Sequence, residues 1–219
     1  MSTELGKIEK PLVKEFEKGR KLFFVPLMYG GKELPSDYLK IFNKYWEQVE
    51  NQISDLELKL GQVNRIYHEL ISSKGEEGIK VLKKLNDKSY QIAESRIKRE
   101  AQLEAMEDAE ILAEFMDWSR CLRIGLQNQK VMEIVYEAYN ESSKNRNEFI
   151  SKCLDETLET EEIGILFMGE GHKVTFPSDI EIFYISPPAL DEIERWFRNR
   201  EAQHSRKNEN ATEEEKGGV

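Results

Sequence analysis

The sequence has little of several features that would narrow its function at once. Its 219 residues include two cysteines and three histidines, and no apolar run approaches the roughly 20 residues that cross a bilayer. Cys121 and Cys153 lie far apart and match no zinc-binding spacing or disulfide framework. Because no signal peptide is recognisable either, we expect a soluble protein of the reducing cytoplasm.

Basic charge is also scarce relative to acidic charge. The chain carries 42 acidic and 32 basic residues, for a formal net charge of −10. A field of this sign repels nucleic acids and anionic membranes, and basic clusters such as KKLNDK are short. We therefore expect neither partner. With 34% charged residues, the composition favours long surface helices over a compact all-β fold.

A helical repeat is the clearest pattern that is present. Spacings of three and four residues alternate along Leu39, Phe42, Trp46, Val49, Ile53, Leu56 and Leu60. This pattern predicts a helix that begins at Ser36 or Asp37 and ends before Gly61, which acts as a C-terminal cap. Such a seam packs either into the chain's own core or against a second copy. We take Phe42, Trp46, Val49 and Ile53 as its centre, in an interface or in the core.

Four short apolar runs, near residues 22–29, 63–70, 163–168 and 180–185, predict the strands of a small sheet. The last two are joined by about ten residues without a helical pattern. Because parallel neighbours usually need a longer crossover, we expect these strands to be antiparallel or not adjacent, in a mixed sheet of about four strands.

The remaining pattern completes a helix-rich α/β protein with one domain over residues 21–198. Long helical stretches near residues 89–158 predict an insertion between the second and third strands, with a break near Glu107 and Asp108 as one alternative. Residues 1–20 predict a helical arm. Residues 199–219 are polar without core positions, and we expect a disordered tail there.

Candidate metal ligands follow the predicted strands. His68 and Glu69 end the second strand, and Glu170 and His172 follow the third in a glycine-punctuated loop. In α/β sheets ligands bind beyond the carboxyl ends of the strands. There, His68, Glu69 and His172 would bind Zn, Mn or Fe, with Glu170 as general base. The alternative is that the glycines only turn the chain, Glu170 and His172 are exposed, and His68 is a hydrogen-bonded structural histidine.

A second acidic pattern, at residues 107–117, indicates a solvent-exposed helix face rather than a metal site. Glu107, Glu110, Glu114 and Asp117 share one helical stripe, and inward-facing glutamates on the helices of a bundle can form dinuclear carboxylate sites. The Glu-x-x-His motifs that such sites require are absent, so the stripe is interpreted as a solvated face.

Two functions remain open on the sequence alone. The first is a non-catalytic protein without cofactor that acts through protein contacts. It would self-associate through the helix at 39–60 or bind a protein partner, with the acidic tail as a contact arm. The alternative is a metal-dependent hydrolase or small-ligand-binding protein that uses His68, Glu69, Glu170 and His172.

Overall fold

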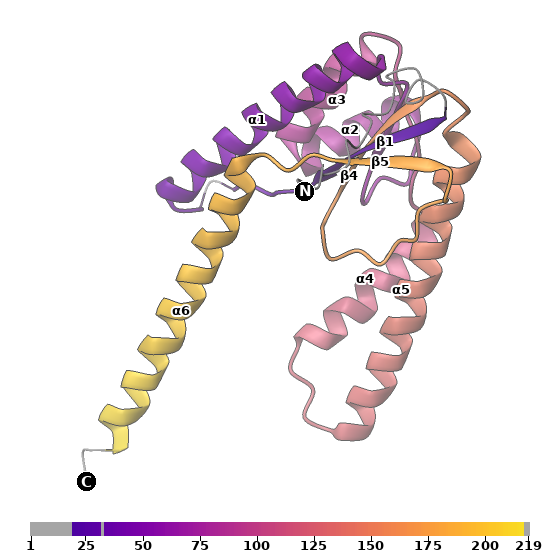
Figure 1. Ribbon diagram of the computed structural model, residues 1–219. Coiled ribbons are helices and arrows are strands. Elements are labelled where there is room, and N and C mark those ends of the chain that lie inside the picture. Colours follow the sequence, from indigo (N-terminus) through magenta and orange to yellow (C-terminus); the bar gives the residue numbers. More distant parts are fainter. Residues whose placement is uncertain (1–18, 32, 217–219) are drawn as a thin grey trace, which may run out of the picture.

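Five parallel strands form one sheet at the centre of the computed structural model, in the order β3-β2-β4-β1-β5 (Figure 1). The structure describes residues 19–31 and 33–216. The strands are β1 (Arg20–Pro26), β2 (Arg65–His68), β3 (Gln102–Leu103), β4 (Ile163–Met168) and β5 (Ile180–Tyr184). All carboxyl ends of the strands therefore meet at one edge of the sheet.

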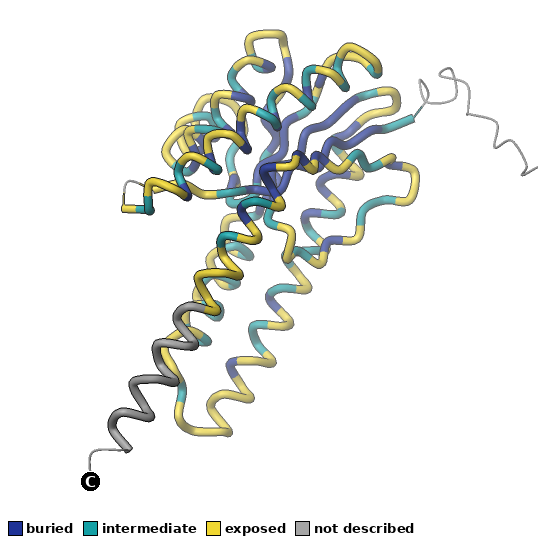
Figure 2. The backbone as a smooth tube through the Cα atoms, turned by 60° about the vertical axis from the view of Figure 1, so that its left-hand side comes forward, coloured by how far each residue is buried: buried dark blue, intermediate teal, exposed yellow. Residues whose placement is uncertain are grey.

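Helices cover both faces of the sheet. They are α1 (Ser36–Leu60), α2 (Gly75–Leu85), α3 (Asp87–Ile97), α4 (Ala109–Arg123), α5 (Gln129–Thr157) and α6 (Pro188–Lys216). One core cluster joins the sheet to α1, α2, α3 and α6, and a second joins its other face to α5. Figure 2 shows the strands as the buried layer between them.

Successive residues of a strand point to opposite faces of the sheet, so they belong to two separate core clusters. Phe23 and Val25 of β1 pack toward α1, whereas Leu22 and Phe24 pack toward α5. β4 alternates in the same way and is buried along its whole length. Strands that are covered on both faces have apolar residues at consecutive positions, which is why these runs are continuously hydrophobic.

The α/β, helix-rich fold is confirmed, but the sheet is entirely parallel rather than mixed. β4 and β5 are not adjacent, because β1 lies between them and pairs with both. The connection between them packs against the α5 face through Val174 and Phe176. At about 3.3 Å per residue this extended segment is long enough to return along a short strand and pass over one neighbour without a helix. The fifth strand, β3, has only two residues and lies within a stretch expected to be helical.

The helix at residues 36–60 forms as predicted, but its seam is not an interface. Phe42, Trp46, Val49 and Ile53 are all buried in the chain's own core, where they pack against the sheet. Trp46, for example, lies 6.3 Å from Phe167 of β4 between ring centroids. A heptad-like seam fits the face of a parallel sheet as well as a second helix, so the repeat could not tell the two apart.

Two helical arms extend beyond the sheet on the same side (Figure 1). One is the hairpin of α4 and α5. The other is α6, which packs on α1 near its start and continues to Lys216. Residues 199–216, expected as a disordered tail, thus continue this helix, since the stretch has no proline or glycine before Gly217. The predicted N-terminal arm falls almost wholly on residues 1–18, outside the described residues.

Nowhere in the described ranges does a helix have the length and apolar content needed to cross a bilayer.

Candidate functional site

The candidate site lies at the carboxyl edge of the sheet, beyond β2 and β4. β2 is followed by α2 on one face of the sheet, and β4 by a crossover on the opposite face. Connections that leave neighbouring strands toward opposite faces open a crevice between them, and ligands of open α/β proteins bind in such crevices. The sequence predicted that the ends of β2 and β4 would meet at this edge, and they do; the end of β1 lies at the same edge.

Glu69 is the side chain that ties these three strand ends together. Its Oε2 accepts a hydrogen bond from the backbone N–H of Gly169 (3.2 Å), and its Oε1 accepts one from the hydroxyl of Tyr29 (3.2 Å). Burial raises the pKa of the Glu69 carboxyl, and these two donors and nearby Arg146 oppose that rise. The carboxylate is thus held in one orientation with both oxygens engaged.

A buried ion pair forms the floor beside Glu69. The guanidinium of Arg146, on α5, donates to both carboxylate oxygens of Glu107, and both side chains are almost fully buried. Glu107 also accepts from the backbone N–H of Leu70 (3.1 Å), a residue with a positive φ of 68° just after β2. The pair therefore fixes both the turn at the end of β2 and the position of Arg146.

Glu69, Leu70 and Arg146 border a cavity of about 310 Å³ between α5, Phe115 of α4 and the loop after β4. Its lining includes Glu69, Phe115, Tyr139, Asn140, Ser143, Arg146, Asn147, Gly169, Gly171, His172 and Lys173. The size falls in the range of small-molecule sites. Most of its polar side chains come from one face of α5, so the helix supplies a row of hydrogen-bonding groups.

Two cationic hydrogen-bond donors at this cavity have no protein partner in the described part of the chain. Among the described residues, no side chain or backbone acceptor pairs with Lys173 Nζ or with Arg146 Nη1, whose neighbouring nitrogens hold Glu107. The side chains of Asn140, Ser143 and Asn147 are likewise without hydrogen-bond partners there. The carboxylates of Glu69 and Glu107 already accept hydrogen bonds from the protein, whereas the amides of Asn140 and Asn147 and the hydroxyl of Ser143 can each donate or accept. A molecule with an anionic acceptor would therefore find two cationic donors here that no protein group occupies.

His172 adds one more donor. Its Nδ1 accepts from the backbone N–H of Val174 (3.2 Å), which leaves the proton of the neutral ring on Nε2. Burial lowers the pKa of His172, and its ring packs against Phe24 and Phe176. The histidine is thus a neutral, oriented donor at the rim of the cavity.

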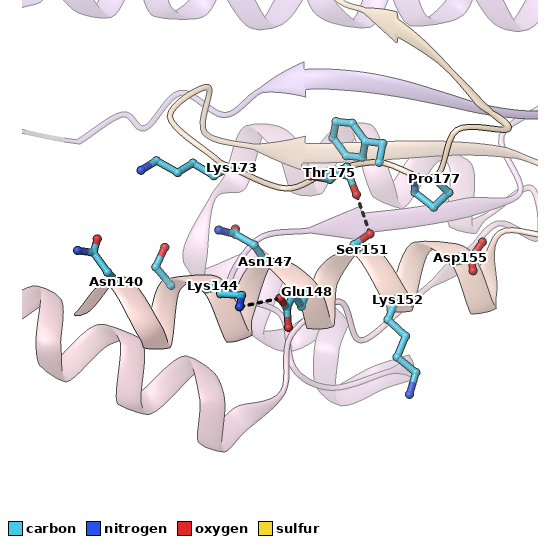
Figure 3. A pocket seen from close by; sticks show the side chains of 12 residues that line it. Asn140, Lys144, Asn147, Glu148, Ser151, Lys152, Asp155, Lys173, Thr175 and Pro177 are labelled. Atoms are coloured by element: carbon cyan, nitrogen blue, oxygen red, sulfur yellow. Dashed lines mark hydrogen bonds and ion pairs between the residues drawn. The ribbon is translucent and has the colours of Figure 1, made fainter. Parts of the chain in front are cut away.

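The cavity continues into a groove of about 660 Å³ along α5. Figure 3 shows α5 as one wall and the segment 173–177 as the other, with Lys173 projecting above Asn140 and Asn147. The hydroxyl of Ser151 donates to the carbonyl of Thr175 (2.6 Å) and ties the two walls together. Asn140, Ser143, Asn147 and Lys173 line both spaces, so the cavity and the groove are continuous.

The predicted metal site is not formed. Among the described residues no three histidine, cysteine or acidic side chains are placed to hold a metal ion. His68 points away from the cavity into the core: its Nδ1–H donates to the carbonyl of Glu69 (2.7 Å) and its Nε2 accepts from Ser89 Oγ (3.0 Å). Glu170 is exposed, and its pKa is raised by partial burial and by Glu194 of α6. Only Glu69 and His172 of the four reach the cavity.

The reason lies in the alternation of strand residues. His68 and Glu69 are consecutive, so their side chains leave β2 on opposite sides, one toward α3 and one toward the cavity. Adjacent residues at a strand end therefore cannot both serve one site on the same face.

No protein-family model, curated protein or solved structure matches this chain.

Three residues of the site escaped sequence reasoning. Glu107 was placed on a solvated helical stripe, but it precedes α4 and is buried. No sequence pattern singled out Arg146 or Tyr29. The apolar Met106 next to Glu107 was the one available hint of burial, and no pattern in the sequence indicated that Arg146 lies opposite.

Proposed function

We propose that this protein binds a small ligand with an anionic group, such as a phosphate or carboxylate, in the cavity at the carboxyl edge of the sheet. The observation that carries the proposal is that two cationic donors, Lys173 Nζ and Arg146 Nη1, have no protein partner in the described part of the chain, while the nearby carboxylates already accept hydrogen bonds. Charged donors form the stronger hydrogen bonds to anions, and Lys173 and Arg146 both supply them. This proposal develops the ligand-binding function expected from the sequence and leaves out the metal-dependent reaction.

The residues have distinct roles in this proposal. Lys173 and Arg146 Nη1 contact the anionic group, and Asn147 and the Nε2–H of His172 complete its hydrogen bonds. Glu69 is held by Gly169 and Tyr29, so it accepts from a ligand hydroxyl or amine only in a fixed direction. The rings of Phe115 and Tyr139, 5.5 Å apart, offer an apolar wall for the rest of the ligand.

A thermal-shift screen tests this proposal. The full chain is heated with inorganic phosphate, sugar phosphates, nucleotides and dicarboxylates, each beside a neutral analogue. A ligand at 100 times its Kd stabilises a folded protein by about 2.7 kcal/mol, which is a clear rise in Tm. We expect anionic compounds to raise the Tm and their neutral analogues to leave it unchanged.

Affinity measurements on a matched pair of variants then locate the site. Lys173→Gln removes an exposed charge at the cavity, and Lys80→Gln removes one from α2, on the other face of the sheet. Loss of one charge-assisted hydrogen bond, about 1.5–3 kcal/mol, weakens binding roughly 10-fold or more. Equal affinities for the two variants, or preference for the neutral analogues, would contradict the proposal.

A further inference from the structure

The hairpin of α4 and α5 has more apolar surface than it can bury by itself. None of the 15 residues of α4 is buried, although the helix carries seven apolar or weakly polar side chains. These are Ile111, Leu112, Phe115, Met116, Trp118, Cys121 and Leu122, all only half-buried. A helix that packs on one neighbour needs an apolar stripe about 100° wide, and these residues spread over a wider face.

The part of α5 that packs against α4 also has more apolar surface than the hairpin buries. Near the tip of the hairpin, Val135 packs inward and is buried, whereas Val131 and Ile134 beside it are 44% and 53% exposed. Ile124 in the connecting turn is 72% exposed. Each helix of the hairpin therefore presents apolar surface to its partner helix and to a second direction as well. Each helix in a four-helix bundle packs on two neighbouring helices and so needs two such contacts.

We propose that two copies of this chain associate through the tips of their α4–α5 hairpins to form an antiparallel four-helix bundle. The contact stripe on α5 is Val131, Ile134 and Ala138, which lie three and four residues apart on one face of the helix. This inference is independent of the proposed ligand. The self-association surface that we propose is the exposed stripe of α5 and not the seam of α1, which is buried.

The charges beside this stripe indicate a second copy as the occupant. Lys130 and Glu137 are both exposed along the same edge of the stripe. Lys130 lies four residues before Ile134 along the helix, and Glu137 lies three residues after it. When two such helices pack antiparallel about a twofold axis near Ile134, Lys130 of one copy faces Glu137 of the other. The symmetry then produces this opposite-charge pair twice. A contact surface that complements itself in this way suits its own copy better than an arbitrary partner.

Charge reversal tests the bundle without disturbing the fold. Sedimentation velocity of the full chain is measured over a range of concentrations for the wild type, for Lys130→Glu and for Glu137→Lys. We expect a dimer for the wild type and at least 10-fold weaker association for each variant, because each places like charges opposite one another. An equimolar mixture of the two variants restores both pairs and regains the dimer.

Glu148→Lys provides the matched control. Glu148 is an exposed acid on the same side of α5, eleven residues beyond Glu137, past the end of the partner helix in this pairing. We expect its variant to dimerise as the wild type does. The inference is overturned by a wild type that stays monomeric at every concentration, by variants that dimerise unchanged, by a mixture that fails to regain the dimer, or by an equal loss in Glu148→Lys.

Discussion

Glu69 and Gly169 are separated by a hundred residues, yet the backbone N–H of Gly169 donates directly to the Glu69 carboxylate (3.2 Å). This bond joins the ends of β2 and β4 where their connections leave toward opposite faces of the sheet. The same carboxylate accepts from Tyr29 at the end of β1. One side chain thus fixes the mouth of the cavity.

Two substitutions of Glu69 separate the effect of its hydrogen bonds on stability from the effect of its charge. In Glu69→Gln the amide oxygen accepts from Gly169, and the amide nitrogen donates to the Tyr29 oxygen, so we expect a change in unfolding free energy below about 1 kcal/mol. Glu69→Ala leaves both partners unsatisfied and costs about 1–3 kcal/mol. Urea denaturation of both variants checks this, and equal losses would show that the hydrogen bonds do not fix the edge.

His68 predicts a specific dependence of stability on pH. Burial lowers its pKa to about 4 in the folded protein, whereas an unfolded histidine titrates near 6.5. Between these values the unfolded chain binds more protons, so the contribution of His68 to stability is complete above pH 6.5 and falls as the pH is lowered toward 4. The loss amounts to about 3 kcal/mol.

A variant isolates this contribution from those of other groups. We expect the unfolding free energy of His68→Gln to fall less than that of the wild type between pH 7 and pH 4, as measured by urea denaturation at each pH. His172→Gln serves as the comparison, since that ring is only half-buried. If the unfolding free energies of the wild type and of His68→Gln fall equally between pH 7 and pH 4, the titration of His68 does not cause the loss of stability.

The buried pair of Arg146 and Glu107 predicts a large effect on stability. Arg146→Met keeps most of the side-chain volume but leaves the carboxylate of Glu107 buried without its cation, which costs about 3–5 kcal/mol. The exposed pair of Lys152 and Glu156 on the same helix gives the contrast: Lys152→Met is expected within about 0.5 kcal/mol of the wild type. Denaturation without added ligand compares the two, and similar values would mean that the buried pair is replaceable.

The seam of α1 predicts core behaviour rather than interface behaviour. Ile53 is fully buried, whereas Leu58 on the same helix is 86% exposed. We expect Ile53→Ala to lower the unfolding free energy by about 2–5 kcal/mol and Leu58→Ala to change it by less than about 0.5 kcal/mol. An interface role for Ile53 would appear instead as a destabilisation that depends on protein concentration.

Local patterns predicted the elements well, because they depend on neighbouring residues. The helices at 36–60 and 129–157 follow from apolar spacing, and Gly61 ends the first with a φ of 119°. The hydrophobic runs of β1 and β4 follow from burial on both faces. β3 was missed because two residues carry no periodicity, and their strand conformation depends on pairing with β2.

The sheet order and the site depend on contacts that no local pattern records. β1 lies between β4 and β5, and every strand pair is parallel; the sequence limits the possible strand orders and directions without selecting one. The carboxyl edge was correctly predicted to gather Glu69 and the loop containing His172. Which of two adjacent residues, His68 or Glu69, points into the cavity depends on the strand's orientation in the sheet. The partnership of Arg146 with Glu107 depends on how α5 packs.

The most direct test of the central claim is a titration of the isotope-labelled protein with inorganic phosphate, followed by ¹H–¹⁵N correlation spectra. If the cavity binds anions, the amide signals of Gly169, Gly171, His172 and Lys173 shift together and saturate, and Lys173→Gln weakens these shifts. If the signals at this edge stay fixed, or shift only along with lysine-rich surfaces elsewhere on the molecule, the cavity is not an anion-binding site.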